Sequence, residues 1–130
     1  MKIRHDFHIH TRLSLCANES ATVENYLAIA RCLGLTKLGF ANHFWDETIP
    51  GATPFYIPQN LSHVLQLKPE LAAVTDPKIK LYFGCEAEYD PVRRDVALSE
   101  KVASQFDFIL VPNSHTHLVM PRDCYHPYQK

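Results

Sequence analysis

The chain has 130 residues, of which 46% are hydrophobic and 21% are charged, as expected for one domain with a buried core. Its formal net charge of -1 excludes the basic surplus of most nucleic-acid-binding proteins, so no nucleic-acid partner is expected. The longest apolar runs are too short to cross a bilayer, and the charged first residues do not resemble a signal peptide. The four cysteines follow neither a zinc-knuckle nor a disulfide-framework spacing. We therefore predict a cytoplasmic protein with free thiols and no membrane partner.

The first half of the chain predicts two strands separated by a helix. Alternation of side-chain character over residues 4–10 indicates a strand. Apolar positions three and four residues apart predict an amphipathic helix over residues 23–33, with Ser20 or Thr22 as its N-cap and Gly34 at its C-terminus. A second strand is expected over residues 35–41.

The second half continues the alternation of strands and helices. Residues 44–58 contain three prolines and a glycine, which predicts a long irregular loop. A helix is expected over residues 59–74, either continuous or interrupted at Pro69. Strands are predicted at residues 79–83 and 108–111, with a helix between them over residues 98–105. Such alternation is typical of an α/β protein with a parallel sheet covered by helices.

Metal-binding side chains stand at the end of every predicted strand. In a strand, His8 and His10 point to the same side, because side chains alternate with a period of two. Ligands of parallel α/β folds bind outside the carboxyl ends of the strands. Imidazole and carboxylate groups are common metal ligands. The sequence therefore predicts a metal site from the following side chains: His8, His10, His43, Glu86, His115 and His117.

Four short motifs resemble those of the polymerase-and-histidinol-phosphatase (PHP) family of metal-dependent phosphoesterases. They are His8-Ile9-His10-Thr11, Ala41-Asn42-His43, Gly84-Cys85-Glu86 and the segment Ser114-His115-Thr116-His117. The order of these motifs, each after a predicted strand, makes the set more specific than any one of them. The stretch Asn42-His43-Phe44-Trp45-Asp46 is closest to the histidinol-phosphatase-like branch.

The resemblance implies a distorted, TIM-like (β/α)7 barrel, of which this sequence carries the first four β/α units. Residues 1–130 are therefore expected to form the N-terminal part of a PHP domain. The family has a late Asp-x-His motif, and near that place this chain has only Asp123-Cys124-Tyr125-His126. The missing C-terminal half would be supplied by a longer chain or by another copy in a homo-oligomer.

The same resemblance implies a cluster of two or three zinc, manganese or iron ions. His8, His10 and Glu86 would hold one ion, Glu86 would bridge to a second ion bound by His115, and His43 would complete the cluster. His117 remains an alternative to His115. Cys16 or Glu19 stands where the family carries an acidic ligand, and Asn42 replaces an aspartate beside His43.

The implied activity is hydrolysis of a small phosphate monoester, as in histidinol phosphatases, by a metal-bound water. Arg12 either contacts the substrate phosphate or is a solvated loop charge. Glu88 either supports Glu86 from the same strand face or is a surface carboxylate. The alternative is a non-catalytic metal-binding remnant or interaction module of a truncated domain, because the late ligands are missing.

Overall fold

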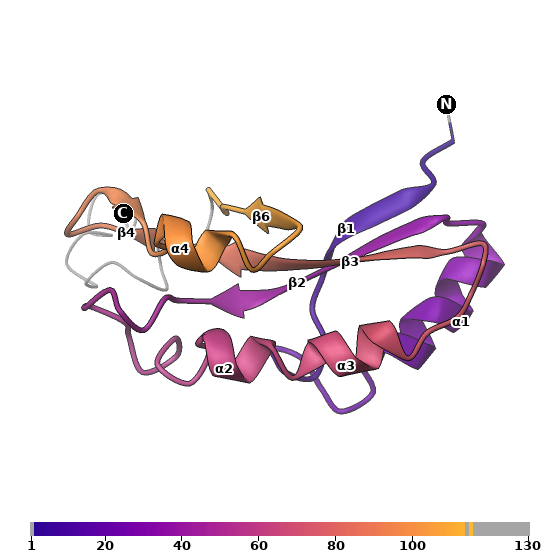
Figure 1. Ribbon diagram of the computed structural model, residues 1–130, viewed down its shortest axis with the longest axis horizontal. Coiled ribbons are helices and arrows are strands. Elements are labelled where there is room, and N and C mark those ends of the chain that lie inside the picture. The colour runs from indigo at the N-terminus through magenta and orange to yellow at the C-terminus, as the bar shows by residue number, and fades with distance from the viewer. Residues whose placement is uncertain (1, 114, 116–130) are drawn as a thin grey trace, which may run out of the picture.

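The computed structural model describes residues 2–113 and residue 115. Its elements in chain order are β1 (His5–Ile9), α1 (Val23–Leu33), β2 (Lys37–Phe44), α2 (Leu61–Val64), α3 (Leu67–Ala72), β3 (Lys80–Ala87), β4 (Tyr89–Asp90), β5 (Asp95–Val96), α4 (Glu100–Ala103) and β6 (Phe108–Leu110). Four strands form one parallel sheet in the order β1-β2-β3-β6 (Figure 1). The short strands β4 and β5 make a separate antiparallel pair.

The barrel that the family resemblance implies is wrong, whereas the parallel sheet that the alternation of strands and helices predicts is confirmed. The sheet is curled and open, and three of the four helices in the described residues are only four to six residues long. A barrel closes only when its first and last strands hydrogen-bond to each other. Within the described part of the chain, β1 pairs only with β2, and β6 pairs only with β3. Strand–helix alternation predicts parallel neighbours, but it does not determine whether a sheet closes.

Helix α1 has the bounds that the sequence predicts, and its ends explain why. The Thr22 side chain accepts a hydrogen bond from the Asn25 backbone N–H, which satisfies one of the unpaired donors of the first turn. At the other end Gly34 adopts a left-handed conformation with a φ of 70°, which costs glycine little. The helix packs its apolar stripe into the core through Val23, Leu27 and Ala30.

The second expected helix is divided into α2 and α3. Pro69 lies in the first turn of α3, where its missing backbone N–H is not needed. A continuous helix would place this proline in its interior, where its ring would clash with the preceding turn. The chain therefore begins a new helix at Leu67, after Leu65 closes α2. Strands β2 and β3 extend several residues beyond their predicted ends, and the β4–β5 hairpin was not predicted.

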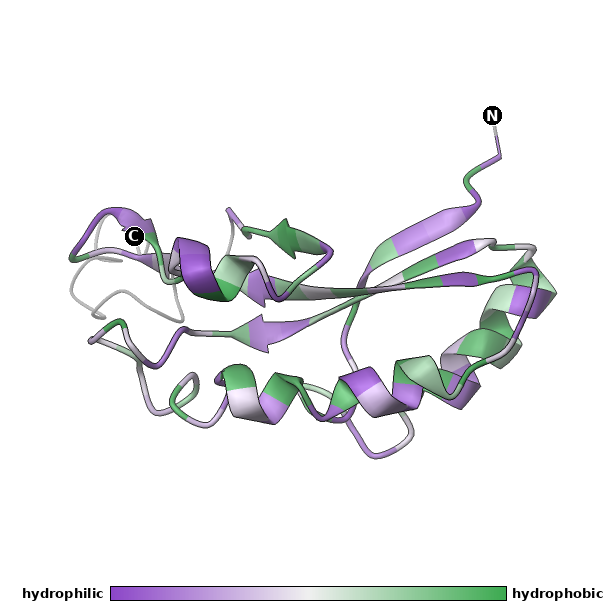
Figure 2. Cartoon of the chain, in the orientation of Figure 1, coloured by the Kyte–Doolittle hydropathy of each residue, from purple (hydrophilic) through white to green (hydrophobic). Residues whose placement is uncertain are grey.

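The two faces of the sheet have different partners. Leu38 and Phe40 on β2 belong to the core that includes α1 and α3, and Figure 1 shows α1, α2 and α3 along one side of the sheet. The opposite face carries Phe7 and Phe108, whose rings pack edge to face with their centroids 5.2 Å apart. Gly84 lies directly under the Phe108 ring, so a Cβ at this position would collide with the ring. Figure 2 shows β6 as hydrophobic and the start of β1 as hydrophilic.

Candidate metal centre

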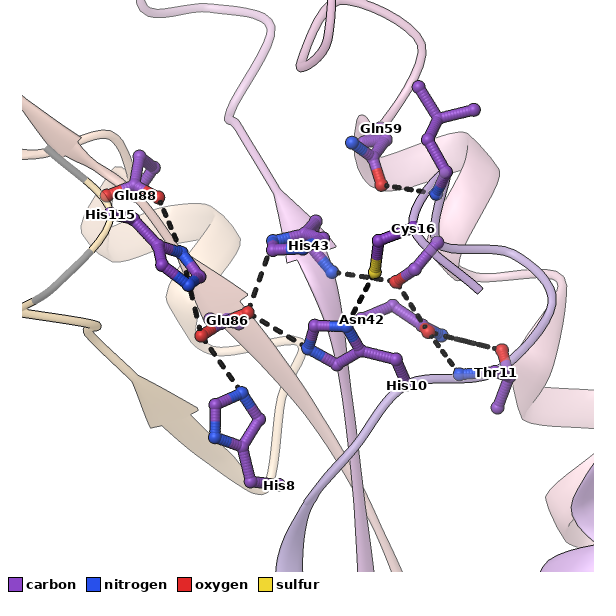
Figure 3. A network of polar contacts seen from close by, with 12 residues as sticks. His8, His10, Thr11, Cys16, Asn42, His43, Gln59, Glu86, Glu88 and His115 are labelled. Carbon is purple, nitrogen blue, oxygen red and sulfur yellow. Dashed lines mark hydrogen bonds and ion pairs between the residues drawn. The ribbon is translucent and has the colours of Figure 1, made fainter. Parts of the chain in front are cut away.

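His8 and His10 point to the same carboxylate at the carboxyl end of β1. The Nε2 atom of His8 lies 2.9 Å from Oε1 of Glu86, and Nε2 of His10 lies 2.9 Å from Oε2 (Figure 3). The pairing of β1 with β2 shifts register between Asp6 and Ile9. His10 follows this irregularity, so the two imidazoles approach Glu86 from different directions. The expected convergence of His8 and His10 is therefore found in the structure.

His43 reaches the same carboxylate from the neighbouring strand. His43 on β2 is the register partner of Glu86 on β3, and neighbouring parallel strands are only about 4.8 Å apart. Its Nδ1 lies 3.1 Å from Oε2 of Glu86. Strand register alone thus explains why residues 43 apart in sequence meet at this site.

Glu86 is the centre of the cluster and is completely buried. Neither of its oxygens, nor Nε2 of His10 or Nδ1 of His43, makes a hydrogen bond of good geometry within the described residues. The short distances between the imidazole nitrogens and the Glu86 oxygens therefore show that these possible metal ligands face the same space. Burial raises the pKa of Glu86, but the nearby imidazoles of His10 and His43 outweigh it and bring the pKa below its usual value.

The buried imidazole of His43 is held in its neutral form. Burial lowers its pKa to about 4, and the neighbouring imidazole of His10 adds to this effect. A neutral imidazole has a free lone pair, which is the form that binds a metal ion. At neutral pH His43 is therefore ready to act as a ligand.

A second buried carboxylate lies beside the cluster. Nδ1 of His115 is 3.3 Å from Oε2 of Glu88 and 3.9 Å from Oε1 of Glu86. Glu88 is 1% exposed, and its Oε2 accepts a hydrogen bond from the Tyr56 hydroxyl at 2.5 Å. Of the two roles left open for Glu88, the surface carboxylate is excluded. The contact with Tyr56 was not predicted, because residues in a long loop carry no spacing signal for a distant strand.

A buried polar network holds the loop after β1 against the end of β2. The Asn42 side-chain oxygen accepts hydrogen bonds from the Thr11 backbone N–H at 2.7 Å and from the Ser14 hydroxyl at 2.9 Å. The Ser14 hydroxyl oxygen in turn accepts from the His43 backbone N–H at 3.1 Å. Asn42 thus links the loop that carries His10 to the strand that carries His43.

The donor atoms around Glu86 fit divalent metal ions. Three overlapping groups place one ligand atom per residue within 4.8 Å of one another: His8 with His10 and Glu86, His43 with Glu86 and His115, and His10 with Cys16 and His43. Imidazole nitrogen together with carboxylate oxygen suits zinc, manganese and iron. Within the described residues, Glu86 and Glu88 have no lysine or arginine partner. Two buried carboxylates without a cationic side chain are a reason to expect a bound cation.

Five of the six predicted metal ligands come together in this cluster, namely His8, His10, His43, Glu86 and His115. His117 lies outside the described residues. Arg12, which was predicted either to contact the substrate phosphate or to be a solvated loop charge, forms a bidentate ion pair with Glu70. The guanidinium nitrogens lie 2.6 and 3.1 Å from the carboxylate oxygens. This pair ties the loop after β1 to α3, and the substrate role of Arg12 stays a prediction.

A pocket of about 370 Å³ opens beside the cluster. Its lining includes His10 and Cys16 together with the polar side chains of Asn18, Ser20 and Asn25. Among the residues that the structure describes, no lysine or arginine lines it. A ligand bound here would therefore meet neutral polar groups and the imidazole of His10.

The architecture and the cluster define an α/β protein with a candidate histidine–carboxylate metal centre at the carboxyl ends of its strands. No protein-family model matches the chain, and no curated protein matches it in sequence. In the described part of the chain, every helix is too short or too polar to span a bilayer.

Proposed function

We propose that this protein is a metal-dependent phosphoesterase of the histidinol-phosphatase type, as the resemblance of its motifs to the PHP family implies. The observation that carries the proposal is the surroundings of Glu86, a carboxylate without solvent exposure that faces the imidazoles of His8, His10 and His43. Isolated buried carboxylates are costly, and a coordinated cation offsets that cost.

The two oxygens of Glu86 suit a bridging role. Oε1 faces His8 and, at a longer distance, His115, whereas Oε2 faces His10 and His43. Each oxygen of this carboxylate can therefore join the histidines on its own side in binding a metal ion. Divalent ions held there supply charge neutralisation for phosphate oxygens and activation of a water molecule. In this proposal two or three zinc, manganese or iron ions are held by the cluster.

The residues of the chain prepare the site for such a substrate in two ways. Burial keeps His43 neutral, so its nitrogen is available as a ligand at neutral pH. The neutral lining of the pocket beside His10 leaves the negative charge of a phosphate to the cations of the cluster. The leaving group of a small phosphate monoester would then occupy the pocket among Asn18, Ser20 and Asn25.

A reducing cytoplasm suits the thiols of this protein. Cys16, Cys32 and Cys85 are free thiols, and two of them, Cys16 and Cys32, are exposed to solvent. Exposed thiols persist best in a reducing compartment. We therefore propose a cytoplasmic location together with the phosphoesterase activity.

The experiment that tests this function combines metal content with turnover. The protein is purified without chelator, its metals are measured by elemental analysis, and its mass in solution is recorded on the same sample. Hydrolysis of p-nitrophenyl phosphate and of histidinol phosphate is then measured with added zinc, manganese or ferrous iron. We expect metal-dependent release of phosphate by the wild type and none by Glu86→Gln.

Asp76→Asn is the matched control, because Asp76 is a partly exposed carboxylate paired with Arg31 on α1, outside the cluster. This variant should retain the metal-dependent activity. Bound metal without phosphate release from either compound would support the non-catalytic metal-binding alternative, whereas a metal-free protein would contradict both functions.

A further inference from the structure

The imidazole of His10 lies between two different partners. Its Nε2 atom is 2.9 Å from Oε2 of Glu86, and its Nδ1 atom is 3.1 Å from Sγ of Cys16. Figure 3 shows the ring with Glu86 on one side and the Cys16 sulfur on the other. The two ring nitrogens therefore face different groups. In a neutral imidazole one nitrogen carries the proton and the other carries a free lone pair.

The nitrogen on the Glu86 side is the better metal ligand. It shares the fully buried carboxylate with Nε2 of His8, so this side combines two imidazoles with a negative charge. A neutral imidazole carries one proton, and metal binding at Nε2 leaves that proton on Nδ1. The Nδ1–H group then points to Sγ of Cys16, which is able to accept a weak hydrogen bond.

We infer that Cys16 is a positioning residue, which holds His10 in the tautomer and ring orientation that bind metal through Nε2. This inference rests on the metal centre of the proposed function. Metal-binding histidines usually donate their second N–H to a carboxylate, a backbone carbonyl or water, and the loss of such a partner weakens metal binding. In this chain the sulfur of Cys16 takes that place.

The surrounding loop fixes both partners of this contact. The Tyr26 hydroxyl donates a hydrogen bond to the His10 carbonyl at 2.8 Å, which anchors the backbone of the histidine. The Ala17 N–H donates to the Ser14 carbonyl at 3.0 Å, and this turn encloses Cys16. Because the Ser14 hydroxyl is bound to Asn42, the sulfur is held by the same network that supports the cluster.

The alternative role for Cys16 is direct ligation, since its sulfur also forms a possible group with His10 and His43. Direct ligation through this group would draw His10 toward the sulfur by Nδ1, on the side away from Glu86. A single ion cannot use both nitrogens of one ring. The two roles therefore predict opposite tautomers of His10 in the metal-loaded protein.

The test measures zinc affinity of the whole chain by competition with a chromophoric chelator. Cys16→Val removes the hydrogen-bond acceptor, and we expect zinc affinity to fall about 10- to 100-fold. Cys16→Ser keeps an acceptor and should recover most of that loss. Cys32→Val is the matched control, because Cys32 is another exposed cysteine, on helix α1, and should bind zinc like the wild type.

Two spectra on the wild type make the test independent of how well the variants fold. Long-range proton–nitrogen NMR of the zinc-loaded protein should show the His10 proton on Nδ1. The cobalt-loaded protein should lack a thiolate-to-cobalt charge-transfer band. A proton on Nε2, a thiolate band, or unchanged zinc affinity of Cys16→Val would each overturn the inference while leaving the metal centre intact. Failure of the wild type to bind zinc or cobalt would overturn the proposed function, and the inference with it.

Discussion

His43 and Glu86 face each other across two neighbouring parallel strands, and Nδ1 of the histidine lies 3.1 Å from Oε2 of the carboxylate. Both side chains are almost completely buried. The register of β2 and β3 thus presents an acid and a base to each other without solvent between them. Because the opposite side of the carboxylate meets His8, this pair forms the structural centre of the whole candidate site.

Substitution of the central carboxylate should remove the stabilisation that metal gives to the fold. A ligand that binds only the folded state raises the free energy of unfolding, by about 2.7 kcal/mol when its concentration is 100 times the dissociation constant. We expect zinc to raise the melting temperature of the wild type and to change the melting temperature of Glu86→Gln very little. Thermal unfolding with and without zinc measures this difference.

Asp76→Asn again provides the comparison, since it removes a carboxylate charge in the loop before β3 without touching the cluster. Its melting temperature should rise with zinc as much as that of the wild type. An equal rise in Glu86→Gln would show that zinc binds elsewhere on the chain.

The metal-free protein should lose stability in mildly acidic solution because of His43. The imidazole titrates at about 4 in the folded state, below its ordinary value of 6.5. Between these two pH values the unfolded chain binds more protons than the folded chain, so the free energy of unfolding falls as pH falls. The slope from this one group reaches at most about 1.4 kcal/mol per pH unit.

Denaturant unfolding in chelator at several pH values between about 4 and 7 measures this slope. His43→Gln lacks the titrating group, and its free energy of unfolding should vary less with pH over the same window. Glu86 acts at lower pH, because its lowered pKa stabilises the fold until the carboxylate is protonated. Identical slopes for the wild type and His43→Gln would assign the pH dependence to other groups.

The sequence predicted the cluster better than it predicted the fold around it. The carboxyl ends of parallel strands meet at one edge of a sheet, so a ligand after each strand was sufficient to place His10, His43 and Glu86 together. Closure of the sheet depends on strand tilt and stagger over many residues, and local periodicity does not carry this information. The Tyr56–Glu88 contact joins residues far apart in sequence, and no local pattern pairs a loop tyrosine with a strand carboxylate.

Asn42 should contribute to stability through the buried donors that it satisfies. Asn42→Ala leaves the buried Thr11 N–H without its acceptor, and an unsatisfied buried donor costs about 1–3 kcal/mol. Asn42→Asp keeps an oxygen for the Thr11 N–H and the Ser14 hydroxyl, so its loss should be smaller. Denaturant unfolding of the two variants measures the difference.

The control for this series is Asn18→Ala. Asn18 is exposed, and among the described residues its side chain bonds only to Ser20 in a local turn, so the free energy of unfolding should change by less than about 0.5 kcal/mol. Equal losses in Asn42→Ala and Asn42→Asp would contradict the prediction, because the hydrogen bonds to the acceptor oxygen would then not outweigh the cost of a buried carboxylate.

Gly84 should be required because of the aromatic ring that covers it, two residues before Glu86 on β3. A Cβ at this position would collide with the Phe108 ring, and overpacking of this kind costs about 1–3 kcal/mol. Phe108→Leu removes the edge of the ring, so the double variant Gly84→Ala/Phe108→Leu should be more stable than the sum of the two single losses predicts. A double-mutant cycle of unfolding free energies measures this coupling, expected at about 0.5–3 kcal/mol. Gly34→Ala is the matched control, because it strains a left-handed residue whose Cβ would have no neighbour within 4 Å, and it should combine additively with Phe108→Leu. Additive losses for Gly84→Ala and Phe108→Leu would show instead that the strand backbone moves to accommodate the methyl group, and that the close approach of ring and strand is not what requires glycine here.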